Sequence, residues 1–209
     1  MTKHPLLIPL GLVLIVLAGC GTSQPANFYT LDDAGFDFLA DGETAVVLGI
    51  GPIRVPEYLE RSQIVTRGPG AELLVDDFNR WAEPIGRAHH RIISNNVDSL
   101  LDGVVVVGFP YGPVMTYDAK LVGRIGRFDM DTSGTTRLAV FWAIATADGD
   151  VLVEPTRSEY TETGGEPTDP NSIASAMSNC LTQFSRDIAA AVNALRDAGD
   201  FNRAPPSAP

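Results

Sequence analysis

The chain has 209 residues, with 15 Lys and Arg against 26 Asp and Glu, and a formal net charge of −11. This length accommodates one domain with a substantial core, and the acidic balance argues against nucleic-acid binding and against attachment to anionic lipid through a polybasic surface. Two cysteines exclude a disulfide scaffold, and no Cys/His cluster in the sequence indicates structural zinc.

The N-terminus has the pattern of an export signal. Residues 6–17 are uncharged and apolar, but this stretch is shorter than the roughly 20 residues that a membrane-spanning helix needs. It follows a short basic start and precedes Leu-Ala-Gly-Cys at residues 17–20, which resembles a bacterial lipobox. In a lipobox the cysteine thiol receives diacylglycerol and becomes the mature N-terminus. We therefore predict a lipoprotein signal peptide over residues 1–19 and lipid attachment at Cys20.

Residues 20–27 are predicted to form the lipidated N-terminus and a short tether. At about 3.3 Å per residue, the segment after Cys20 spans at most roughly 25 Å, so the domain must lie close to its membrane. Apart from the diacylglycerol and N-acyl chain on Cys20, we expect no cofactor and no metal. Residue 21 is Gly. Because Asp at this position often retains Gram-negative lipoproteins in the inner membrane, Gly21 favours a location on the periplasmic face of the outer membrane.

The mature chain begins with patterns typical of strands. Residues 28–31 are predicted to start a strand, and residues 45–56, which are rich in Val and Ile, form a second one. Residues 63–67 and 72–75 flank a Gly-Pro-Gly turn and predict a hairpin. A helix then begins at Pro84, which suits the first helical position, and ends before Gly103.

The second half of the chain is predicted to add strands and a long helix. The strands are expected at residues 104–109, 117–129, 135–147 and 151–161, the last three antiparallel. Asn171 or Ser172 is expected to cap the final helix, which ends near residue 198. We predict one α+β domain over residues 28–199, a mainly antiparallel sheet with both helices on one face, and a mobile Pro-rich tail at residues 200–209.

Few residues show a spacing typical of catalysis or metal binding. The GxSxG, HExxH and P-loop motifs do not occur in the sequence. Cys180 lies on the apolar face of the final helix and is predicted to be a core residue. His89 and His90 point about 100° apart on a helix, so they cannot chelate one metal, and we expect them at the surface or its boundary. Residues 129–134 imitate the start of a calcium loop, but Val140 replaces the required Glu, so a hairpin turn is expected.

Two motifs carry a resemblance to a known family. They are residues 49–67 (GIGPIRVPEYLERSQIVTR) and residues 78–84 (FNRWAEP), preceded by Tyr29 and Leu31 after the lipobox. Together they resemble the ABC-type transport auxiliary lipoproteins, the family of PqiC (formerly YmbA), over most of the mature domain. The resemblance implies no catalysis. It implies that the protein docks a membrane-anchored MCE-domain protein, which works with an ABC permease and ATPase to move lipids between the inner and outer membranes.

The residues that contact a partner are predicted from one interruption of the strand pattern. Residues 56–61 combine aromatic, apolar and charged side chains, and Tyr and Arg are good interface anchors. We therefore expect Tyr58, Leu59 and Arg61 to contact the partner. The alternative is that Tyr58 and Leu59 cover a sheet edge while Arg61 pairs with a nearby acid. Trp81 is expected to pack in the core or at its boundary.

Two other functions remain open at this point. A lipid carrier with its own apolar cavity would retain phospholipid after purification. An activator of an envelope enzyme, such as a peptidoglycan synthase, would retain that enzyme as its partner. A homo-oligomeric ring around the MCE-domain protein is compatible with the docking function, because one repeated head-to-tail interface closes a ring.

Overall fold

The computed structural model describes residues 24–34, 46–112 and 116–202. The predicted signal peptide, Cys20 and residues 203–209 of the predicted tail lie outside the described residues. Among the described helices, none is both long enough and apolar enough to cross a membrane.

A five-stranded sheet, here called the large sheet, forms the centre of the domain in the order β5-β2-β6-β7-β8. Its strands are β2 (Val46–Arg54), β5 (Val104–Gly108), β6 (Ala119–Met130), β7 (Thr136–Thr146) and β8 (Val151–Glu162). The strands β6, β7 and β8 pair antiparallel, whereas β2 pairs parallel with both β5 and β6. The large sheet is therefore mixed.

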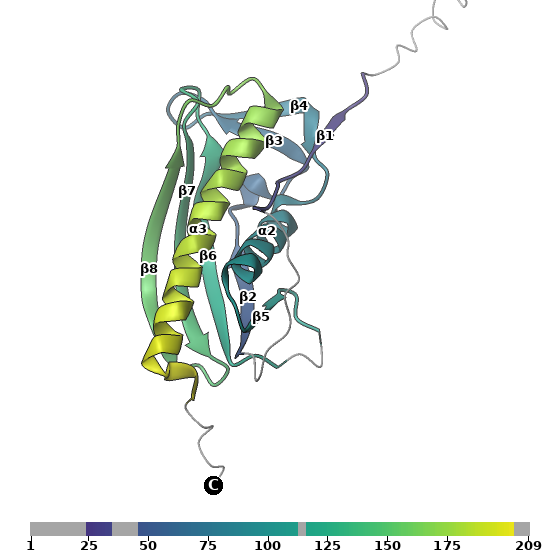
Figure 1. Ribbon diagram of the computed structural model, residues 1–209. Helices are drawn as coiled ribbons and strands as arrows, with labels where there is room; N and C mark the ends of the chain where they lie inside the picture. Colours follow the sequence, from purple (N-terminus) through teal and green to yellow (C-terminus); the bar gives the residue numbers. More distant parts are fainter. Residues whose placement is uncertain (1–23, 35–45, 113–115, 203–209) are drawn as a thin grey trace, which may run out of the picture.

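A three-stranded sheet, here called the small sheet, lies at one end of the molecule (Figure 1). It consists of β1 (Asn27–Tyr29), β4 (Leu73–Trp81) and β3 (Gln63–Arg67), in that order. The pairing of β3 with β4 is antiparallel and that of β1 with β4 is parallel. A 3-10 helix, η1 (Glu57–Leu59), connects the end of β2 to β3.

Two α-helices in the described part of the chain cover one face of the large sheet (Figure 1). They are α2 (Ile85–Leu100) and α3 (Pro170–Ala198), which is followed by the 3-10 helix η2 (Asp200–Asn202). The carboxylate of Asp169 accepts the N–H of Asn171 at the start of α3, and Gly199 ends the helix with a φ of 76°. Phe184 of α3 is fully buried and stacks edge-on against Trp142 of the large sheet.

The predicted α+β domain is confirmed, with differences in its sheets and at the ends of its helices. The sequence predicted one sheet, whereas a second, small sheet forms because β4 runs on to Trp81 and pairs with β1 as well as β3. Asp169, and not Asn171 or Ser172, caps α3. Pro84 is the residue before α2 and not its first helical residue. Phe201 of η2 packs against the core, so the folded domain continues past residue 199.

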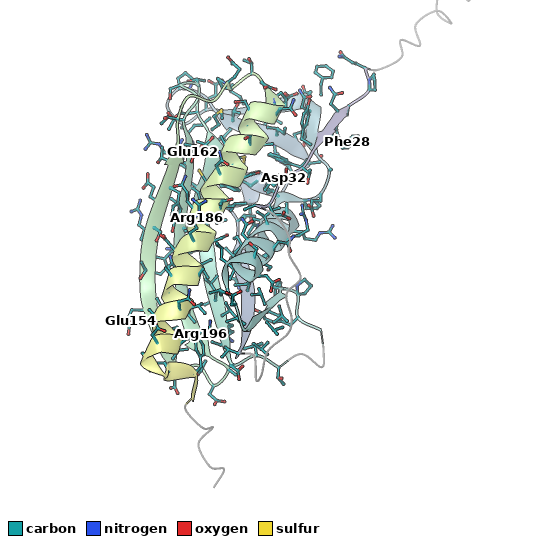
Figure 2. The ribbon with its side chains drawn as sticks, in the orientation of Figure 1. Phe28, Asp32, Glu154, Glu162, Arg186 and Arg196 are labelled. Carbon is teal, nitrogen blue, oxygen red and sulfur yellow. The ribbon has the colours of Figure 1, made fainter. Side chains whose placement is uncertain are left out.

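The segment after β1 is fastened to both helices. Leu31 is buried in the core. The N–H of Asp32 donates to Ser178 Oγ of α3 over 3.0 Å, and the N–H of Ala34 donates to Asn96 Oδ1 of α2 over 2.7 Å. Figure 2 labels Asp32 beside the helices and Phe28 nearer the end of the molecule. These contacts fix where the N-terminal segment joins the domain.

Candidate partner-contact site

The three residues predicted to contact a partner have different environments. Leu59 of η1 is 3% exposed and packs in the core. Tyr58 is half-buried. Arg61, between η1 and β3, is exposed and forms no ion pair with any other described residue. Of the three side chains, that of Arg61 is therefore the one fully available to a partner, while Leu59 and Tyr58 hold the segment in place.

The buried carboxylate of Asp129 holds the segment of residues 56–61 against the large sheet. Asp129 lies on β6 between Phe128 and Met130, which are fully buried in the core, so its side chain points to the opposite face of the sheet. The Tyr58 hydroxyl donates to Asp129 Oδ2 over 2.8 Å. Arg67 donates to both carboxylate oxygens, over 2.7 and 3.1 Å.

Arg127 completes the shell around Asp129. Its Nε donates to Asp129 Oδ1 over 2.8 Å, so two guanidinium groups and one hydroxyl surround a single fully buried carboxylate. Burial raises the pKa of the Asp129 carboxyl, but the hydrogen bonds from Arg67 and Tyr58 and the charge of Arg127 outweigh burial and bring the pKa below its usual value. Burial and the bond to Asp129 raise the pKa of Tyr58 to about 12. The cluster thus remains a bound carboxylate with a neutral phenol.

The prediction that His89 and His90 lie at the surface or its boundary is wrong. Both are buried on the face of α2 that packs on β2. The N–H of Ile53 donates to His90 Nε2 over 2.8 Å, and the carbonyl of Ile53 lies 3.0 Å from His89 Nε2. Because β5 ends at Gly108, opposite Ile50, the backbone of Ile53 has no strand partner on that side. The two imidazoles form the hydrogen bonds to the Ile53 backbone that a neighbouring strand would otherwise form.

The chemistry of the two histidines differs. Because His90 Nε2 accepts a hydrogen bond, its proton lies on Nδ1 and is donated to the carbonyl of Gly86. His89 faces two carbonyl oxygens, those of Ile85 and Ile53, so a neutral ring donates to one of them only. Burial, and secondarily the charge of His90, lowers the pKa of His89 to about 4, which keeps the ring neutral at physiological pH. Burial also lowers the pKa of His90.

The helical spacing indicates that His89 is buried. His89 follows Ile85 by four positions and precedes Ile92 and Ile93 by three and four, so it lies in the apolar stripe of the helix. No comparable signal identifies Asp129, because its partner Tyr58 is 71 positions away in the sequence.

The remaining candidates have structural roles. Cys180 is a free, fully buried thiol whose pKa burial raises to about 12, as a core residue requires. Trp81 is buried in the core, as predicted. A turn joins β6 and β7, which confirms the predicted hairpin, and Asp131 accepts the N–H groups of Ser133 and Thr135 there. The described ranges contain no group of three His, Cys, Asp or Glu residues arranged to hold a metal ion.

Comparison with known proteins gives the family. The model of the family described as "ABC-type transport auxiliary lipoprotein component" matches residues 29–189, which is well over half of the chain. The chain belongs to this family. The family match confirms the resemblance, and it makes the protein an auxiliary lipoprotein of ABC-type transport with a membrane-anchored location in the cell envelope. No curated protein matches the sequence.

Two crystal structures have a similar fold. One, of an uncharacterized protein, has a TM-score of 0.64 and 18% identity, and the match covers 81% of this chain and 99% of that chain. The other, of a protein from Xanthomonas campestris, has a TM-score of 0.60 and 16% identity, and covers 83% of this chain and 99% of that chain. At these identities the similarity shows the fold alone.

Replacing the buried carboxylate tests its role. Asp129→Asn leaves two arginines around a neutral amide, so we expect the free energy of unfolding at pH 7 to fall by about 3 kcal/mol. The pKa of Asp129 in the fold lies below the usual 3.8, so as pH falls the unfolded chain takes up the proton first. The difference in the free energy of unfolding between the wild type and Asp129→Asn therefore decreases below about pH 4. Urea denaturation at pH 7 and pH 3.5 measures both effects. Asp77→Asn, at an exposed position, is the control, and equal losses in both variants would contradict the prediction.

The buried histidines predict a second pH dependence. Their pKa values are lower in the fold than in the unfolded chain, so stability is complete above about pH 6.5 and is lost as pH falls toward 4. For His89 the full loss is about 3 kcal/mol. Within residues 20–209 the only histidines are His89 and His90. Urea denaturation between pH 7 and pH 5, where carboxylates stay ionised, should show a smaller slope in His89→Gln than in the wild type. An unchanged slope would refute the assignment.

Proposed function

We propose that this protein is a non-catalytic lipoprotein, anchored through Cys20 to the periplasmic face of the outer membrane, that docks the MCE-domain protein of an ABC-type lipid transport system. The observation that carries the proposal is the match of the family model across almost the whole folded domain, from β1 into α3. The MCE-domain protein is the partner implied by the family, with its permease and ATPase on the opposite membrane. The auxiliary lipoprotein completes the lipid path at the outer membrane.

The local structure around Arg61 supports a docking role. An interface anchor contributes most when its own backbone is already ordered in the free protein, because binding then costs less conformational entropy. Two contacts order the backbone just before Arg61. Leu59 packs in the core, and the Tyr58 hydroxyl donates a hydrogen bond to Asp129. Arg61 itself is exposed. We propose Arg61 as the contact residue, with Tyr58 and Leu59 as its support.

Purification of the lipidated protein from detergent-solubilised envelope tests the proposed partner. We expect mass spectrometry of the retained proteins to detect an MCE-domain protein with an ABC permease. A cell-wall synthase in its place would support the activator function, and phospholipid as the sole companion would support the carrier function. Either result would refute the docking proposal.

A single substitution tests the contact residue. Arg61→Ala removes an exposed side chain, so we expect unchanged folding and about tenfold weaker binding of the MCE-domain protein. Arg186→Ala is the matched control, because Arg186 is also exposed but lies on α3 (Figure 2). Wild-type affinity in the folded Arg61→Ala variant would remove Arg61 from the interface. Tyr58→Phe keeps the ring and removes the hydrogen bond to Asp129. Weaker binding of the MCE-domain protein by this variant would show that the hydrogen bond supports the segment that carries Arg61.

The lipid anchor has its own test. Only a thiol at position 20 can form the thioether to diacylglycerol, so Cys20→Ser should leave the precursor uncleaved and without the mass of the acyl chains. Intact-mass measurement of the membrane fraction detects both changes. A mature, acylated Cys20→Ser protein would show that the anchor lies elsewhere.

A further inference from the structure

Exposed apolar side chains concentrate on the small sheet. Of the nine large hydrophobic residues that are exposed in the described part of the chain, four lie on β1 and β4. Three of them fall within five consecutive positions of β4, and the fourth lies on β1, which pairs directly with β4. These four residues, here called the small-sheet patch, are Phe28, Leu74, Val75 and Phe78. Leu74 and Val75 are consecutive and point to opposite faces of the strand, whereas Phe28 pairs with Arg80, two positions after Phe78, so the two phenylalanines share one face. Phe28 is 67% exposed and Phe78 50%, which is a large cost in water for two aromatic rings.

Phe78 is held outward by local hydrogen bonds. The register of β4 against β3 shifts between Val75 and Arg80. Within this irregularity Asp76 Oδ1 accepts the N–H of Phe78 over 2.9 Å and that of Asn79 over 3.0 Å. The Asn27 side chain of β1 donates to the Asn79 side chain over 3.2 Å. The backbone that presents Phe78 is thus fixed from both β1 and β4.

The lipid anchor approaches the domain at this same sheet. The chain after Cys20 reaches Asn27, the first residue of β1, within roughly 25 Å even when fully extended. Beyond β1, the bonds of Asp32 to α3 and of Ala34 to α2 fix the chain to the domain. The small sheet is therefore the part of the fold that the anchor keeps nearest to the bilayer.

The opposite end of the molecule lies far from the anchor. The helix α3 begins near the small sheet and runs the length of the large sheet to η2 (Figure 1). With 29 residues at about 1.5 Å each, it is about 43 Å long. Contact through the far end would place the small sheet about 43 Å from the bilayer, beyond the roughly 25 Å reach of the tether, so the far end cannot rest on the membrane while the anchor is inserted.

The charge around the small-sheet patch indicates which lipid surface suits it. Residues 57–81 contain five acids and three arginines, and Arg67 is already bound to Asp129. Among the described residues no polybasic surface surrounds the patch, so it has little attraction for anionic headgroups. Apolar side chains in such a setting suit the interface of a zwitterionic phospholipid bilayer, where rings enter the boundary between headgroups and acyl chains.

We infer that the small-sheet patch contacts the neutral phospholipid surface of the membrane that holds the anchor, so that the domain stands on its small sheet with α3 directed away from the bilayer. This inference rests on the proposed anchoring through Cys20. It adds an orientation that a flexible tether alone does not impose. A fixed orientation matters for a docking protein, because it places Arg61 at a defined height above the membrane for a partner arriving from the other side.

Site-specific fluorescence tests the contact. The mature, lipidated protein carrying Phe78→Cys is labelled with an environment-sensitive dye and reconstituted in vesicles of phosphatidylcholine and phosphatidylethanolamine that contain nitroxide-labelled lipid. Cys180 is fully buried and does not compete for the label. Phe141→Cys is the matched control, because Phe141 is 41% exposed on β7 of the large sheet. We expect the nitroxide lipid to quench the dye at position 78 about threefold more strongly than the dye at position 141.

The outcomes separate the contact from the anchor. Adding Phe28→Asp to the Phe78→Cys protein should reduce the quenching, since a carboxylate opposes entry into the interface. Equal, weak quenching at both positions in protein that floats with the vesicles would refute the membrane contact and leave the anchor intact. Failure of the acylated protein to float would refute the anchor and the contact together. A different result is that the dye at position 78 reports an apolar environment only after the MCE-domain protein is added, without quenching by the nitroxide lipid. That result would assign the patch to a protein interface and overturn the inference.

Discussion

The Asp129 carboxylate joins the two sheets of the domain. It belongs to β6 of the large sheet, while Arg67 belongs to β3 of the small sheet and Tyr58 to the connection between them. A fully buried carboxylate is costly to desolvate, and its attraction to one cation rarely recovers more than that cost. Arg127 lies on β6 beside Asp129 and stays with it in any arrangement of the sheets, whereas Arg67 and Tyr58 reach the carboxylate only when β3 and η1 lie against β6. The cluster therefore specifies how the sheets sit together more than it stabilises the fold.

This linkage connects the functional parts of the protein. The small sheet carries the apolar patch and includes β1, which follows the proposed lipid anchor in the chain, and η1 carries the segment that leads to Arg61. If the small sheet could rotate on the large sheet, neither part would have a defined position relative to the helices. The bonds from Asp32 and Ala34 to α3 and α2 add a second connection on the other side. The orientation that we infer at the membrane thus depends on side chains far from the proposed anchor.

Local patterns predicted most elements, and long-range contacts account for what they missed. The strands of the large sheet and both helices have long apolar periodicity, so their positions follow from sequence alone. The hairpin of β3 and β4 is also predictable, but its pairing with β1 is not, because β1 has three residues and its partner lies around residue 80. The parallel pairing of β2 with β5 and β6 could not be predicted either, because apolar periodicity does not give the relative direction of two strands. His89 was predictable from its place in the apolar stripe of α2, whereas the partners of Asp129 required the fold.

The strongly shifted pKa values of the described titratable groups come from burial and structural contacts. Such groups often mark active sites, because catalysis needs a poised proton donor or acceptor that is free to meet a substrate. Here their polar atoms already have structural partners. His90 and His89 bond to backbone groups of α2 and β2, and the Tyr111 hydroxyl donates to the carbonyl of Gly51. The Tyr160 hydroxyl donates to Asp187 over 2.6 Å. Each of these groups is thus tied into the hydrogen bonding of the fold, and the polar interior of the domain contributes to its rigidity.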